Sequence, residues 1–203
     1  RDVERSRGLG DVYKRQSQVS RTVNFLNALL SAGCILFLFW SITRLVRSLL
    51  KEEKENLSVT DVIIILGSGL VGALAYTFSD TFWFSAVEGE VYAFSSFLTA
   101  LVFWMILRWQ DESDTVYGDR WIILIAYIIG LSIGVHLLNL LCIPAIVLVF
   151  YYQKYRTISL KGAIAAIALS GLLIVLILFV YIPGMADICL LYTSPSPRDL
   201  STS

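Results

Sequence analysis

The sequence has few charged residues and one histidine, and these shortages exclude several classes of protein. Only 16% of the 203 residues are charged, 57% are apolar, and the mean hydropathy is +0.72. An ordinary soluble domain is therefore excluded. The 16 basic and 16 acidic residues give a net charge of zero, so the chain has no overall positive field that would attract nucleic acid. We expect a membrane protein with no nucleic-acid partner.

Cysteine is also scarce, and its placement predicts no disulfide. Cys34 and Cys142 lie in apolar runs, where a thiol usually packs as a small hydrophobic group. The third cysteine, Cys189, begins a C-terminal segment of atypical composition.

The two ends of the chain are unusual. Residues 6–16 and 189–199 resemble translations of a sequencing adapter from its two opposite strands. We expect residues 1–16 and 189–203 to be adapter-like artefacts or, alternatively, disordered polar ends. Residues 17–188 are then an incomplete fragment of a longer protein.

Within residues 17–188, apolar runs predict an all-α fold, a polytopic transmembrane helical bundle. A helix needs about 20 apolar residues to cross the bilayer. The predicted spans are residues 23–46, 62–78, 91–109, 121–136, 139–152 and 162–182. The stretch 121–152 is long for one crossing and short for two, and its polar centre predicts a turn near His136 and Asn139. Three glycines of the second span, Gly67, Gly69 and Gly72, have a spacing typical of close helix packing.

Basic residues in the connections predict the orientation. They are Arg44, Arg47, Lys51 and Lys54, then Arg108 and Arg120, then Lys154, Arg156 and Lys161. With two short helices in residues 121–152, all of them fall on one face, which the positive-inside rule assigns to the cytoplasm. The acidic connection 80–90, the turn at His136 and Asn139, and residues 181–184 then share the extracytoplasmic face.

Glu88 and Glu90 are candidates for chemistry because they interrupt an aromatic segment at the membrane boundary. An ionised carboxylate there needs a partner or acts as a base. The alternative is a pair of water-exposed interfacial charges beside tryptophans that lie at the membrane surface. The two side chains face one way only if the segment is extended, since in a helix they diverge.

His136 and Asn139 are three residues apart and can share one helical face that binds an anionic or hydroxyl-rich ligand. The alternative for His136 is a hydrogen-bonded packing residue. The spacing of the one histidine and the two glutamates is not diagnostic of a metal site, so no metal ligand is assigned. A divalent metal ion is a possible cofactor.

Residues 80–96 (DTFWFSAVEGEVYAFSS) and 130–139 (GLSIGVHLLN) resemble a bacterial multi-pass family. The family is called domain of unknown function 2723, or glycosyltransferase family 117, and has a transmembrane protein O-mannosyltransferase as its animal relative. Residues 24–30 and 36–41 agree with it in the first span. The resemblance covers Ser17 to Ile188.

This resemblance implies a GT-C-like membrane glycosyltransferase. Such an enzyme transfers a sugar from a polyprenyl-phosphate donor to a hydroxyl group of a secreted acceptor protein, outside the cytoplasm. The resemblance implies that the protein lies in the lipid bilayer and uses the lipid-linked sugar as its donor substrate. It also implies a bacterial inner membrane, with Glu88, Glu90 and His136 on the periplasmic side. The rival functions are a multi-pass transporter and a non-catalytic membrane scaffold.

The resemblance also implies roles for single residues. The family carries its principal acidic motif ahead of the span at residues 23–46, and this chain begins after it, so we expect the fragment alone to be inactive. Glu88 and Glu90 match the second acidic motif and are expected to support catalysis. The expected substrate-binding residues are Asp80, Tyr92, His136 and Asn139.

Overall fold

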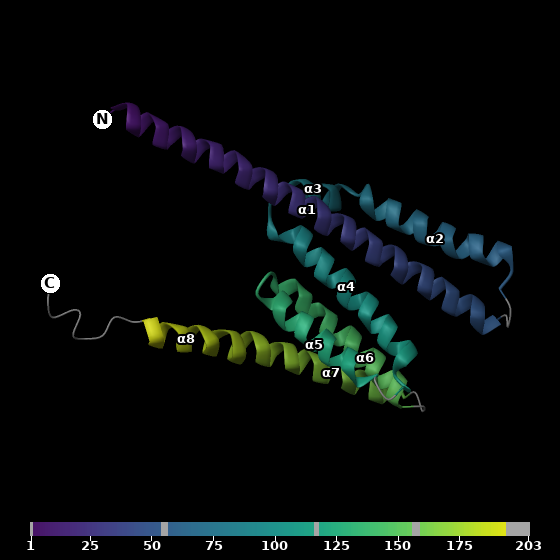
Figure 1. Cartoon of the computed structure of the whole chain (residues 1–203). Coiled ribbons are helices and arrows are strands. Elements are labelled where there is room, and N and C mark those ends of the chain that lie inside the picture. The colour runs from purple at the N-terminus through teal and green to yellow at the C-terminus, as the bar shows by residue number, and fades with distance from the viewer. Residues whose placement is uncertain (1, 54–56, 116–117, 156–158, 194–203) are drawn as a thin grey trace. The chain divides into compact units, whose positions relative to one another are not determined.

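The computed structural model describes residues 2–53, 57–115, 118–155 and 159–193, and every regular element in these ranges is a helix (Figure 1). The α-helices are α1 (Asp2–Glu53), α2 (Val59–Thr77), α3 (Asp80–Val87), α4 (Val91–Glu112), α5 (Asp119–Ile133), α6 (Cys142–Lys154), α7 (Leu160–Leu176) and α8 (Ile182–Thr193). A 3₁₀ helix, η1 (Leu137–Leu141), precedes α6, and a π-helical turn, η2 (Ile177–Tyr181), joins α7 to α8. The predicted all-α helical bundle is confirmed.

Four helical stretches in the described ranges are long and apolar enough to cross a membrane. They are Gln18–Leu50, Val59–Thr77, Val91–Glu112 and Leu160–Cys189. α5 has 15 residues and α6 has 13, which gives rises of roughly 22 and 20 Å against a hydrocarbon core of about 30 Å. Two full crossings by α5 and α6 therefore stay a prediction. The helix breaks after Ile133, close to the polar positions of this stretch.

The chain forms two compact units, residues 1–142 and 143–203. In the first unit, α1 packs along α2 and α4, and α4 packs against α5 and η1 (Figure 1). Aromatic rings fill the space between α1, α4 and α5. Trp104 lies 5.3 Å from Phe37 and 6.2 Å from Trp121 between ring centroids, distances typical of favourable aromatic pairs.

Two of the three glycines in α2 face α1. A Cβ atom at Gly69 would overlap Cγ2 of Thr43, and one at Gly72 would lie 2.6 Å from Cδ1 of Ile42. A Cβ at Gly67 would meet nothing within 4 Å. The small residues at 69 and 72 thus allow the backbones of α1 and α2 to approach closely.

The helix α2 begins at Val59, three residues before the predicted span 62–78. The N-cap is Ser58, whose Oγ accepts a hydrogen bond from the Asp61 amide, while the Asp61 carboxylate accepts one from the Ser58 amide at 2.8 Å. This reciprocal capping box satisfies two amide donors at the helix end. Asp61 therefore lies in the first turn, and the helix begins at Val59.

The second unit continues as a helix past residue 182, where the last span was predicted to end. Residues 181–184 stay helical, and Pro183 directly follows the π-helical turn η2, where the regular α-helical hydrogen-bond pattern is interrupted. Tyr151 of α6 lies against Gly162 at the start of α7, where a Cβ atom would overlap the tyrosine ring.

The described helices also take in residues at both ends of the chain. α1 begins at Asp2 and α8 ends at Thr193, so residues 2–16 and 189–193 are helical. Residues 194–203, together with Lys54 and Arg156 of the orientation argument, lie outside the described residues. The adapter interpretation of both ends stays a prediction.

Candidate functional site

Glu88 and Glu90 flank a one-residue turn between α3 and α4. Glu88 has extended dihedral angles and caps the end of α3, and Glu90 is the N-cap of α4. The Glu90 amide donates a hydrogen bond to the Glu88 carbonyl at 2.8 Å, the pattern of a γ-turn centred on Gly89. The segment is thus bent, and the straight extended segment that would turn both side chains one way is not present. Both residues are exposed, and neither carboxylate contacts a polar partner among the described residues.

The backbone of this acidic turn is held by Asn27 of α1. Asn27 is 6% exposed, and its Nδ2 donates hydrogen bonds to the Ser85 carbonyl at 3.2 Å and to the Glu88 carbonyl. The two acceptors lie at the C-terminal end of α3, where carbonyls lack helical partners. Asn27 therefore fixes the position of Glu88 relative to α1.

Tyr92 and His136 lie against each other across the first unit. Their ring centroids are 5.5 Å apart with an interplanar angle of 52°. Tyr92 is in the first turn of α4, two residues after Glu90, and His136 lies between α5 and η1. The acidic turn and the polar turn are therefore neighbours, although they are more than 40 residues apart in the sequence.

Asn139 forms a second contact between the polar turn and α4. It is 2% exposed, and its Oδ1 accepts hydrogen bonds from Oγ of Ser95, at 3.2 Å, and from Oγ1 of Thr99. Tyr92, Ser95 and Thr99 share one helical face by their spacing. The Nδ2 group of Asn139 is buried and has no hydrogen-bond partner among the described residues. Such a donor costs free energy unless an acceptor reaches it.

Asp80 is the predicted site residue that no described contact brings to this group. It opens α3, eight residues before Glu88, which separates the two by about 12 Å of helix. Across the described ranges, no three His, Cys, Asp or Glu side chains come together as a metal site. We name the acidic turn, Tyr92, His136 and Asn139 the polar site.

Sequence reasoning did not assign roles to Asn27, Ser95 or Thr99. Ser95 and Thr99 are four residues apart in an apolar run, so they lie on one helical face and were open to prediction from spacing. Asn27 is a polar residue within the first span, which is a signal of function or helix contact in membrane helices.

Comparison with known proteins gives one family. No curated protein and no solved structure matches the chain. A family model described as "Protein O-mannosyl-transferase TMEM260 N-terminal domain" matches residues 11–159, which include all residues of the polar site. Because the match covers more than half of the 203 residues, the chain belongs to the protein O-mannosyl-transferase TMEM260 N-terminal domain family, a family of membrane glycosyltransferases.

Proposed function

We propose that the full-length protein transfers a mannose from a polyprenyl-phosphate lipid to a Ser or Thr hydroxyl of a secreted protein, with a GT-C-like bundle as scaffold. Mannose and the hydroxyl acceptor are supported by the family description. The observation that carries the proposal is the contact of Tyr92 with His136, because it joins two polar turns into one site at one end of the bundle.

The charge distribution supports a side of the membrane for the polar site. The polar site lies at the start of α4, whereas Arg108 lies near its end, roughly 27 Å away for 18 residues of helix. The arginine-bearing end belongs in the cytoplasm by the positive-inside rule. We therefore place the polar site outside the cytoplasm, on the periplasmic side of an inner membrane if the protein belongs to the bacterial branch that the sequence resembles.

The reaction itself needs a base and groups that hold a phosphate. The acceptor hydroxyl oxygen attacks C1 of the sugar, the bond between C1 and the phosphate oxygen breaks, and the polyprenyl phosphate leaves with the bonding electrons. The hydroxyl proton passes to a carboxylate. The unpaired Nδ2 group of Asn139 is suited to donate a hydrogen bond to a hydroxyl or phosphate oxygen.

We assign supporting roles to Glu88 and Glu90 in this proposal, since the resemblance puts the principal acidic motif upstream of residue 23. In this proposal the rings of Tyr92 and His136 pack against the sugar. Asp80 contacts the acceptor.

The test is a Glu88→Gln substitution in the full-length protein, with glycan occupancy of secreted proteins as the readout and membrane insertion checked in parallel. We expect occupancy to fall at least about tenfold, since removal of one catalytic acid or base costs typically 10²–10⁴ in rate and a supporting acid less.

The matched control is Asp114→Asn, which removes an exposed carboxylate just beyond the other end of α4. Its occupancy should equal that of the unchanged protein. Unchanged occupancy in the Glu88→Gln protein would mean that the acidic turn has only a structural role at the membrane interface. This result would favour a transporter or scaffold.

A further inference from the structure

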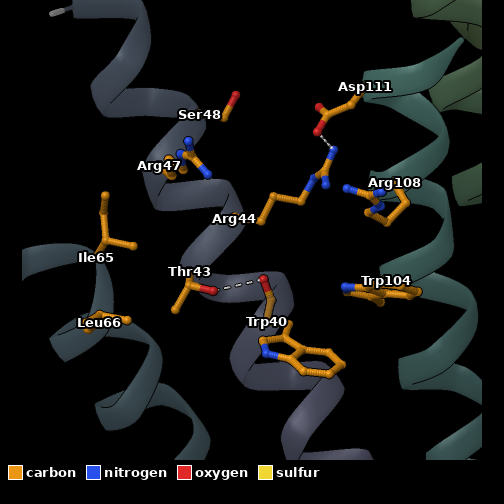
Figure 2. A pocket seen from close by; sticks show the side chains of 10 residues that line it. All are labelled: Trp40, Thr43, Arg44, Arg47, Ser48, Ile65, Leu66, Trp104, Arg108 and Asp111. Atoms are coloured by element: carbon orange, nitrogen blue, oxygen red, sulfur yellow. Dashed lines mark hydrogen bonds and ion pairs between the residues drawn. The ribbon is translucent and has the colours of Figure 1, made fainter. Parts of the chain in front are cut away.

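A cationic pocket lies at the opposite end of α4 from the polar site and has no part in the proposed transfer. It has a volume of about 780 Å³ and lies between the end of α1, the first half of α2 and the end of α4 (Figure 2). Its lining includes three arginines, Arg44, Arg47 and Arg108, and one carboxylate, Asp111.

The acidic groups in reach neutralise this charge incompletely. Arg44 extends from α1 and forms an ion pair with Asp111 of α4, as Figure 2 shows. Arg108 pairs with Glu112 at 2.7 Å, and the same carboxylate accepts a hydrogen bond from Nε1 of Trp121. Arg47 makes no ion pair with a described residue. Among the described residues, three guanidinium groups thus face two carboxylates, an excess of one positive charge.

The other lining groups match an amphiphile rather than a simple ion. Trp40 and Trp104 lie below the arginines in Figure 2, and Ile65 and Leu66 of α2 form an apolar wall. Tryptophan and arginine together are typical of the boundary between hydrocarbon and headgroups. A ligand here meets positive charge at one end of the pocket and apolar side chains at the other.

We propose that this pocket binds the phosphate headgroup of an anionic phospholipid from the leaflet at the arginine-bearing end of the bundle. Guanidinium groups form strong, planar hydrogen bonds with phosphate oxygens. The phosphate takes the excess positive charge at Arg47 and competes with Asp111 for Arg44, while the first carbons of the acyl chains lie against Ile65 and Leu66.

The experiment titrates dioctanoyl phosphatidylglycerol into the full-length protein in a neutral detergent and measures lipid binding by native mass spectrometry. Arg47→Gln should weaken binding about fivefold, the effect of about 1 kcal/mol for one basic residue near an anionic lipid surface. Asp111→Asn should strengthen it by a similar factor, because a competing carboxylate is removed. Since the two changes act in opposite directions, general loss of folding cannot produce the pattern.

Arg21→Gln is the matched control, because it removes an exposed arginine of the same helix, α1, that does not line the pocket, and it should leave binding unchanged. Dioctanoyl phosphatidylcholine and inorganic phosphate are the comparison ligands, and both should bind more weakly than phosphatidylglycerol. Equal binding of inorganic phosphate would overturn the lipid assignment, and equal loss in the Arg47→Gln and Arg21→Gln proteins would overturn the pocket.

Discussion

At the scale of single residues, the position of the acidic turn depends on a buried amide. Asn27 donates to two carbonyls at the end of α3, and one of them belongs to Glu88, 61 residues away in the sequence. A carbonyl left without a donor in a poorly hydrated position costs free energy. Asn27 is therefore a positioning residue for Glu88, and it does not itself touch a substrate in our proposal.

Asn27→Ala should lower the free energy of unfolding of the full-length protein by about 1–3 kcal/mol, the usual cost of unsatisfied buried polar groups. An SDS titration in mixed micelles measures this change. Hydrogen exchange of residues 85–92 should become faster, because the turn loses its contact with α1. Gln18→Ala, which removes an exposed amide side chain more than two turns earlier in α1, should change neither quantity. Equal effects of both substitutions would contradict the positioning role.

At the scale of elements, the packing of α2 on α1 depends on which glycines face the partner helix. Gly69 is buried against Thr43 and lies where a Cβ atom would be 3.0 Å from Cε2 of Phe39, whereas Gly67 has open space around its Cα. Thr43 is β-branched and the Phe39 ring is rigid, so neither moves away easily.

Gly69→Val should therefore destabilise the bundle by about 1–3 kcal/mol, the typical cost of added volume in a packed interior. Gly67→Val adds the same atoms to the same helix and should have little effect. Thermal unfolding of both proteins in detergent distinguishes them. A similar loss of stability in both would mean that valine harms α2 by itself, without regard to the contact with α1.

The helices were open to prediction from the sequence, and several of their contacts were not. Runs of about 20 apolar residues are a local property, so α2 and α4 follow from composition alone. The capping box at Ser58 and Asp61 is also local and was missed, although its spacing is readable in the sequence. The contact of Asn27 with Glu88 depends on the rotation of α1 about its axis, which hydropathy does not specify.

The arrangement of the polar-site residues could be predicted from the sequence only in part, and their roles in the reaction stay predictions. Counting basic residues put Glu88, Glu90 and His136 on one face, and the contact of Tyr92 with His136 brings the two turns together. Spacing could not show that a γ-turn at Gly89 bends the chain between the two glutamates, because a glycine permits many backbone conformations. It also could not show that Asn139 contacts Ser95 and Thr99.

At the scale of the whole molecule, the first unit has two chemically distinct ends. Carboxylates without described partners lie at the start of α4, and the arginine pocket lies around its end. If α4 crosses the bilayer, the two ends are in contact with different compartments. The proposed transfer and the proposed lipid site then require a fixed orientation, in which the arginine end is cytoplasmic.

Cysteine labelling of the full-length protein tests that orientation. In intact cells, a membrane-impermeant maleimide should label a Glu90→Cys protein, because residue 90 is exposed in the acidic turn, and should label an Asp114→Cys protein only after lysis. Cys34 is 3% exposed, but Cys189 is exposed, so Cys189→Ser is introduced into both proteins, and the Cys189→Ser protein without added cysteine gives the background. Labelling of the Asp114→Cys protein but not the Glu90→Cys protein in intact cells would indicate the opposite orientation. The acidic turn would then lie in the cytoplasm, where secreted acceptors are not yet folded or exported, and the extracytoplasmic transfer proposed here would be wrong.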